Sequence, residues 1–289
     1  MRSSSGCYLC PRECGVDRSV STGFCGCSDK LRIAKYMLHF GEEPCISGTR
    51  GSGAVFFSGC GLRCVFCQNN VISHGCKGRE YSEDEFIDIL FELRDKGAHN
   101  INLVTGTHFT DKIAAALKKC RSELGIPVVF NCGGYEKTET LTLLDGLVDI
   151  YLPDFKYLIS QSAEKYSSAR DYPEVVVPAI KEMLRQQPEN LFDSGGIMQK
   201  GVIVRHLVLP GLYKESMQIM ETLSQLKPKP MVSVMRQYAP CFRSSDFPQI
   251  NRKLTTFEYN KVIDCCASLG LEGFSQEKGC DNLDMTPDF

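Results

Sequence analysis

Residues 56–70 read FFSGCGLRCVFCQNN and place Cys60, Cys64 and Cys67 in a C-x3-C-x2-C spacing. The apolar run before Gly59 predicts a strand, and the glycines that follow predict a loop at its end. Three thiols therefore meet on one loop, and thiolates are ligands of iron–sulfur clusters and of zinc. A four-iron cluster normally takes four cysteines, so three would leave one iron open to a substrate or cofactor.

From residue 54 onward, short β-branched or aromatic runs alternate with amphipathic stretches, which is typical of βα units around a parallel sheet. The runs are 54–58, 100–105, 127–131, 148–154, 202–209 and 231–238. Six parallel strands with right-handed crossovers can close partway into a TIM-type barrel, so the predicted fold is an α/β partial (β/α)6 barrel. An open, doubly wound sheet is the rival architecture, and the number of strands does not separate the two. In the barrel, functional residues are expected at the C-terminal strand ends.

The helices between these runs have recognisable start signals. Ser82 and Glu85 form a capping box before an apolar face of helical period, which predicts a helix there. Residues 113–120 repeat the apolar spacing. Thr255 and Glu258 form a second capping box, which predicts a helix near the C-terminus.

Composition and charge limit the partners of the chain. Residues 1–53 are rich in Cys, Gly and Ser with little periodicity, so we treat them as a Cys-rich N-terminal extension and 54–289 as the barrel with its C-terminal helix. A formal net charge of -2 argues against nucleic acid or a membrane surface as a partner. The first residues lack a secretory signal and no apolar run could span a bilayer, so we expect a cytoplasmic protein. Sixteen cysteines in a reducing compartment favour metal or redox chemistry over disulfides.

Four N-terminal cysteines form a second candidate metal site. Cys7, Cys10, Cys14 and Cys25 follow the spacing C-x2-C-x3-C-x10-C. Four thiolates suit either zinc or a second iron–sulfur cluster, and the spacing does not choose between them. Free buried thiols are a third interpretation.

The triplet resembles the C-x3-C-x-aromatic-C motif of the radical S-adenosylmethionine (SAM) superfamily, with Phe66 as the aromatic residue. This resemblance implies a [4Fe-4S] cluster on Cys60, Cys64 and Cys67, with SAM chelated to the fourth iron. It also implies an electron donor such as flavodoxin or ferredoxin, and a 5′-deoxyadenosyl radical that abstracts a hydrogen atom from a substrate. A closed cluster or zinc site with Cys76 as fourth ligand, in a non-catalytic protein, is the alternative.

Most of residues 54–240 resemble the activating enzymes of glycyl radical enzymes, such as pyruvate formate-lyase activating enzymes. The resemblance implies SAM contacts at the ends of later strands, namely Gly106, Thr107, Asn131, Asp154, Lys156 and Arg205. The second strand departs from the superfamily, because no acidic residue follows Gly106 and Thr107. If the resemblance extends to the substrate, the target is a glycine of a partner glycyl radical enzyme. A small molecule or peptide is the alternative, and no residue is assigned as catalytic.

Asp154, Lys156 and His206 also have plainer interpretations, whereas two glycines are consistent with a cofactor site. Asp154 and Lys156 could form an ordinary ion pair on a solvated loop. His206 lies on the strand face opposite Arg205, as expected of a histidine satisfied in the core. Gly133 and Gly134 fit a close approach of the backbone to the cofactor.

Overall fold

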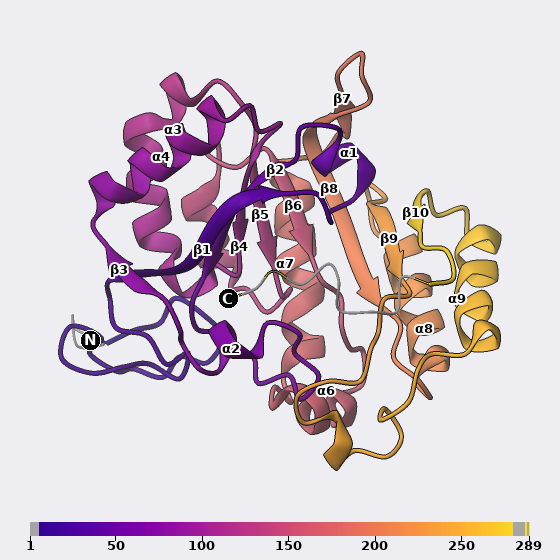
Figure 1. Ribbon diagram of the computed structural model, residues 1–289. Coiled ribbons are helices and arrows are strands. Elements are labelled where there is room, and N and C mark those ends of the chain that lie inside the picture. The colour runs from indigo at the N-terminus through magenta and orange to yellow at the C-terminus, as the bar shows by residue number, and fades with distance from the viewer. Residues whose placement is uncertain (1–5, 280–286, 288) are drawn as a thin grey trace.

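The computed structural model describes residues 6–279, 287 and 289, so the outermost residues of both predicted segments, 1–5, 280–286 and 288, lie outside it. In the described residues, a ten-stranded sheet runs in the order β10-β9-β8-β6-β5-β4-β2-β1-β3, with β7 (Leu191–Phe192) beside β8 (Figure 1). The strands from β2 to β10 along this order are mutually parallel. They are β2 (Ser52–Phe57), β4 (Ile101–Val104), β5 (Val128–Cys132), β6 (Ile150–Pro153), β8 (Met198–Leu207), β9 (Met231–Met235) and β10 (Gly273–Ser275). All six predicted strands are confirmed, and β10 adds a further one.

The distribution of helices decides between the two predicted architectures. Alternate strand residues, such as Phe57, Leu103 and Phe130, belong to one large core shared with the long helices. Their neighbours along the strands, such as Val129 and Leu152, belong to a separate apolar cluster on the other face. The long helices are α3 (Glu83–Asp95), α4 (Thr110–Leu124), α7 (Tyr172–Gln186), α8 (Tyr213–Ser224) and α9 (Thr256–Ser268). Because these helices pack on one face, the curved sheet is an incomplete barrel and not a doubly wound sheet.

The predicted helix starts are present in the structure. Both side chains of the capping box formed by Ser82 and Glu85 make their reciprocal bonds at the start of α3. Thr255 and Glu258 do the same at the start of α9. The shorter helical elements are α1 (Pro44–Ser47), α2 (Asn70–Ser73), η1 (Thr107–Phe109), α5 (Thr138–Leu141), η2 (Thr142–Leu144), α6 (Ser160–Ser167) and η3 (Ser244–Asp246). Among the described helices, none has the length and apolar content that crossing a membrane requires.

The N-terminal segment contributes to the sheet, which the sequence analysis did not predict. β1 (Leu31–His39) pairs antiparallel with β2, and β3 (Arg79–Tyr81) pairs antiparallel with β1. Only Leu31 and Ile33 of β1 are fully buried, so the strand lacks the strict alternation that marks a half-buried strand. The sheet therefore begins inside the segment 1–53.

The helix α1 closes the N-terminal mouth of the barrel, and we call it the plug helix. Ile46 is completely buried in the inner cluster, against residues of β5, β6 and β8. Its carbonyl accepts a bond from Asn100 Nδ2 at 2.8 Å, and Asn100 Oδ1 accepts one from Ser52 Oγ at 2.6 Å. A four-residue helix has no stability of its own, so these contacts hold it in place. They leave the opposite end of the barrel for the site.

We expect Ile46→Ala to lower the free energy of unfolding by about 2 to 5 kcal/mol, because a fully buried side chain leaves a cavity. Ile159 is 41% exposed, and Ile159→Ala should change the same quantity by less than about 1 kcal/mol. Urea unfolding followed by circular dichroism measures both. Equal losses of unfolding free energy in the two variants would contradict the burial of Ile46 inside the barrel.

Candidate active site

A cavity of about 260 Å³ lies at the C-terminal ends of the parallel strands. Cys60, Cys64 and Cys67 all line it, so the structure brings the predicted triplet together on one wall. The same cavity is lined by the polar side chains Asn131, Asp154, Lys156 and Arg205, which come from β5, the end of β6 and β8. Thus four of the six predicted SAM contacts share a cavity with the triplet.

The cysteine loop is anchored by its backbone to distant elements. Arg63 N donates to Ser167 O at 3.0 Å, and Val65 N donates to Tyr166 O at 2.9 Å. Both acceptors belong to α6. On the other side, Val65 O accepts from Arg243 N at 2.9 Å. These bonds fix where the loop presents its thiols.

Each thiol also has one polar neighbour. Leu62 N donates to Cys60 Sγ at 3.3 Å, and Ser167 Oγ lies 3.0 Å from Cys64 Sγ. Cys67 Sγ lies 3.1 Å from Ser73 Oγ. Burial and the neighbouring Cys64 thiol raise the pKa of Cys67 to about 12, and the same two causes raise the pKa of Cys60. Three thiolates packed this way need cations, and bound metal would supply them.

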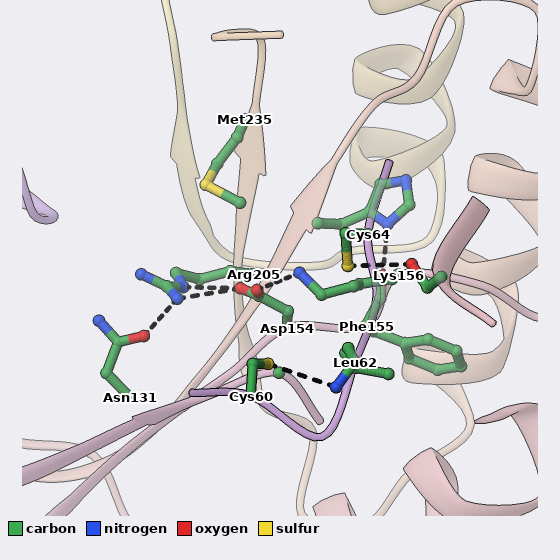
Figure 2. A network of polar contacts seen from close by, with 12 residues as sticks. Cys60, Leu62, Cys64, Asn131, Asp154, Phe155, Lys156, Arg205 and Met235 are labelled. Carbon is green, nitrogen blue, oxygen red and sulfur yellow. Dashed lines mark hydrogen bonds and ion pairs between the residues drawn. The ribbon is translucent and has the colours of Figure 1, made fainter. Parts of the chain in front are cut away.

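An ion-pair network lines the same cavity (Figure 2). Arg205 Nε donates to Asp154 Oδ1 at 3.0 Å, and Lys156 Nζ donates to Asp154 Oδ2 at 2.5 Å. Arg205 Nη2 donates to Asn131 Oδ1 at 2.5 Å. Burial alone would raise the pKa of Asp154, but the charges of Lys156 and Arg205 outweigh burial and hold that pKa below its usual range. The carboxylate is therefore ionised. Their side chains are only 13–19% exposed, so these pairs are not the solvated loop pair of the plainer interpretation.

Glu42 completes this network and was missed by the sequence analysis. Its Oε2 accepts from Arg205 Nη1 at 3.1 Å, and its Oε1 accepts from Asn131 Nδ2 at 3.1 Å and Asn102 Nδ2 at 2.9 Å. Glu42 lies two residues before α1, the helix that closes the barrel, so its place in the barrel depends on that helix. No motif marks it, because the residue lies in a loop 163 positions from Arg205.

Gly106 and Thr107 are not among the residues that line the cavity; Thr105, with φ of 61°, is. A Cβ on Gly106 would lie 2.6 Å from Ile113 Cδ1, so this glycine permits packing against α4. Thr107 Oγ1 donates to Glu136 Oε1 at 2.9 Å. The carboxyl group beside this turn thus comes from the chain after β5, a relation that no local pattern reveals.

The glycines after β5 have different roles. Gly133 lines the cavity, where a Cβ would lie 3.0 Å from Leu62 Cδ1. Gly134, with φ of 74°, has no room for a Cβ, which would lie 2.0 Å from Asp154 O. Its close approach is therefore to the chain after β6 and not to a cofactor. Tyr172 reinforces this contact, since its hydroxyl accepts from Lys156 N at 2.9 Å.

His206 and His108 are buried structural residues that do not line the cavity. His206 Nδ1 lies 2.6 Å from Phe155 O and Nε2 lies 2.8 Å from Ser216 Oγ, which confirms the expected satisfied core histidine. His108 lies in η1, with Nε2 2.8 Å from Ser58 O. Burial lowers the pKa of His108 to about 3 and that of His206 to about 4, so both are neutral at physiological pH.

The other cysteines lie behind the triplet loop. Cys76 Sγ lies 3.6 Å from Cys25 O, and Cys76 is not among the residues that line the cavity. It is therefore not placed as a fourth ligand facing the cavity. Cys7, Cys10, Cys14 and Cys25 likewise do not line it.

Comparison with known proteins identifies the family. Residues 54–223 match the radical SAM superfamily, and the chain belongs to it. The chain is also 30% identical over 274 residues to an uncharacterised protein of Methanocaldococcus jannaschii, an alignment that covers 92% of this chain and 75% of that protein.

A solved structure with a TM-score above 0.5 shares the fold. SuiB of Streptococcus suis with bound S-adenosylmethionine superposes with a TM-score of 0.55 at 13% identity, over 80% of this chain and 51% of SuiB. The present chain thus spans about half the length of SuiB. A domain of a pyruvate-formate lyase-activating enzyme from Bacteroides vulgatus has a TM-score of 0.44 at 13% identity, over 58% of this chain and 91% of that domain.

Glu136 predicts a pH dependence of stability. The side chain is 3% exposed, and burial raises its pKa to about 7. Because the folded state keeps this proton to higher pH than the unfolded state, its contribution to stability is present below about pH 4.5 and is lost as pH rises to about 7. Relative to Glu136→Gln, the wild type should lose up to about 3 kcal/mol of unfolding free energy across this window.

Urea unfolding at about pH 5, 6, 7 and 8 measures this difference. Glu123→Gln, at an exposed position of α4, serves as the matched control and should show no such trend. A gap between wild type and Glu136→Gln that stays constant with pH would contradict the buried, protonated carboxyl.

Proposed function

We propose that this radical SAM enzyme binds a [4Fe-4S] cluster through Cys60, Cys64 and Cys67 and S-adenosylmethionine against the Arg205 network. The observation that carries the proposal is that three thiols and a largely buried ion-pair network line one cavity. Three cysteines leave one iron without a protein ligand, which provides a coordination site for the cofactor. When bound, the cluster and SAM together supply a 5′-deoxyadenosyl radical that abstracts a hydrogen atom.

The donor set fits these groups. The three thiols line the cavity. Burial raises the pKa of Cys60 and of Cys67 and so penalises their thiolates, and iron would relieve that penalty. Lys156 lies near enough to Cys64 for their charges to interact, so its ammonium adjoins both the cluster ligands and Asp154. A carboxylate bound there would meet Lys156 and Arg205, the two cations of the cavity wall.

Residues of the chain fix the position of Arg205 for binding the cofactor, and others keep water from the cavity. Arg205 is fixed from two sides by Asp154 and Glu42, so its guanidinium keeps one position. Asn131 bonds to both Arg205 and Glu42 and joins β5 to this frame. Water is excluded on the apolar side by large side chains, namely Phe56, Phe57, Leu62, Phe66 and Val104.

For the substrate we propose a glycine in a flexible loop of a partner glycyl radical enzyme. The carboxamides of Gln68, Asn69 and Gln237 line the cavity, and carboxamides can bond to both the donors and the acceptors of a peptide backbone. A free peptide would use the same groups. The electron donor is proposed to be a flavodoxin or ferredoxin, and the N-terminal cysteines to hold a second metal centre, an iron–sulfur cluster or zinc.

We expect Cys64→Ala to abolish 5′-deoxyadenosine formation, because the cluster loses one of three protein ligands. The assay uses anaerobically reconstituted protein with dithionite and SAM, and chromatography of the products. Cys266→Ala, on α9 and outside the cavity, is the control and should retain turnover. Turnover by Cys64→Ala comparable to wild type would refute the ligand assignment.

Glu42→Gln should weaken SAM binding about tenfold, since Arg205 loses a charge-assisted bond of about 1.5 to 3 kcal/mol that holds it in place. Equilibrium dialysis of the reconstituted protein under anoxic conditions measures the dissociation constant. Asp246→Asn removes the partner of the exposed Arg243 and is the control. An unchanged dissociation constant in a folded Glu42→Gln protein would remove Glu42 from the site.

A further inference from the structure

The four N-terminal cysteines converge on one region behind the triplet loop. A Cβ on Gly23 would lie 3.4 Å from Cys25 Sγ and 3.5 Å from Cys14 Sγ, so these sulfurs flank the same glycine. The Cys10 thiol lies close enough to those of Cys7 and Cys25 for their charges to interact. The predicted set is therefore gathered by the fold.

The position of these cysteines favours a redox-active centre. Cys60 N donates to Cys25 O at 3.3 Å, so the N-terminal set adjoins the loop that carries Cys60, Cys64 and Cys67. Zinc undergoes no redox change and could only stabilise the segment, whereas a four-iron cluster on four thiolates can also transfer an electron.

A buried arginine provides an independent indication of a negatively charged ligand. Arg18 is 6% exposed, and its Nη1 lies 3.8 Å from Cys7 Sγ. Its guanidinium bonds otherwise to main-chain carbonyls, of Cys27 at 3.3 Å and of Ser28 and His108. Within the described chain Arg18 makes no ion pair with a carboxylate. A buried cation needs a counter-charge, and a four-iron cluster on four thiolates carries net negative charge.

We propose that Cys7, Cys10, Cys14 and Cys25 hold a second [4Fe-4S] cluster, and that this cluster passes electrons to the cluster on Cys60, Cys64 and Cys67. The relay rests on the function proposed above, whereas the metal site does not. In each transfer a reduced flavodoxin or ferredoxin loses one electron to the second cluster, which is reoxidised when that electron moves to the first.

The loop that carries Cys60, Cys64 and Cys67 contacts the N-terminal cysteine segment. Cys60 N donates to Cys25 O at 3.3 Å, and a Cβ on Gly61 would lie 3.9 Å from Cys10 Sγ. Arg12 Nε also donates to Gly61 O at 2.7 Å. The Cys10 thiol and the backbone of Cys25 thus lie beside the triplet loop.

The other half of the N-terminal set faces outward. Cys7 and Cys14 are half-buried, in contrast to the buried Cys10 and Cys25. Val20 is 83% exposed and Phe24 is 38% exposed in the same segment, so apolar surface is available to a donor protein. An electron can therefore enter on the solvent side and leave on the side of the first cluster.

A cysteine outside the N-terminal segment provides the control. Cys120 lies in the core on α4 and is 3% exposed, and it does not belong to the proposed ligand set. Cys27 is unsuitable as a control, because its thiol contacts that of the proposed ligand Cys25.

The first experiment counts metal in protein reconstituted with iron and sulfide without oxygen. We expect about eight irons per chain in the wild type and in Cys120→Ala, and about four in Cys7→Ala and Cys14→Ala. The remaining four irons should respond to SAM in the electron paramagnetic resonance spectrum, which shows that the variants fold. Four irons with one zinc in the wild type, or eight irons in both ligand variants, would overturn the second cluster.

The second experiment compares reductants by the ratio of flavodoxin-driven to dithionite-driven 5′-deoxyadenosine formation. In Cys14→Ala this ratio should fall at least about tenfold below that of Cys120→Ala, corresponding to about 1.4 kcal/mol in a rate barrier. An unchanged ratio would overturn the relay. Absence of product from wild type with dithionite would instead overturn the proposed function, and the iron count would still decide the second cluster.

Discussion

A charged arginine inside the barrel is the constraint on which the site depends. Arg205 is 13% exposed on the inner face of β8, where an unpaired charge would be costly. Asp154 meets it from the end of β6 and Glu42 from the loop before the plug helix α1. Asn131 adds a bond from β5. The pairing is satisfied only when sheet and plug are assembled together, so the fold and the polar wall of the cavity form as one unit.

The features that could be predicted from sequence are those with a local cause. Strand and helix periodicity are local, as are the capping box at Ser82 and Glu85 and the placement of the triplet on a loop after β2. The features that could not be predicted arise from contacts between distant segments. Glu42 has its role only because the plug lies under β8, and β1 is a strand only because the edge of β2 is free to pair.

Two glycines show the same limit of prediction from sequence. A glycine in a loop after a strand is consistent with close approach to a ligand or with close approach to another part of the chain. The sequence of Gly133 and Gly134 does not distinguish these. The structure distinguishes them. Gly134 allows Asp154 O to approach the backbone closely, whereas Gly133 lies beside Leu62 and lines the cavity.

Lys156 adjoins both Asp154 and the cluster ligand Cys64, and this position indicates how the proposed cofactor would bind. Its ammonium bonds to Asp154 and interacts with the charge of Cys64, so it lies between the acidic network and the cluster ligands. A carboxylate arriving beside it exchanges one anionic partner for another and does not require a new charge to be buried alone. Because Arg205 is already held by Asp154 and Glu42, only Lys156 has to adjust. A site in which one flexible side chain moves within a fixed frame keeps its charges oriented before the ligand enters, which is the condition for strong electrostatic stabilisation in a dry cavity.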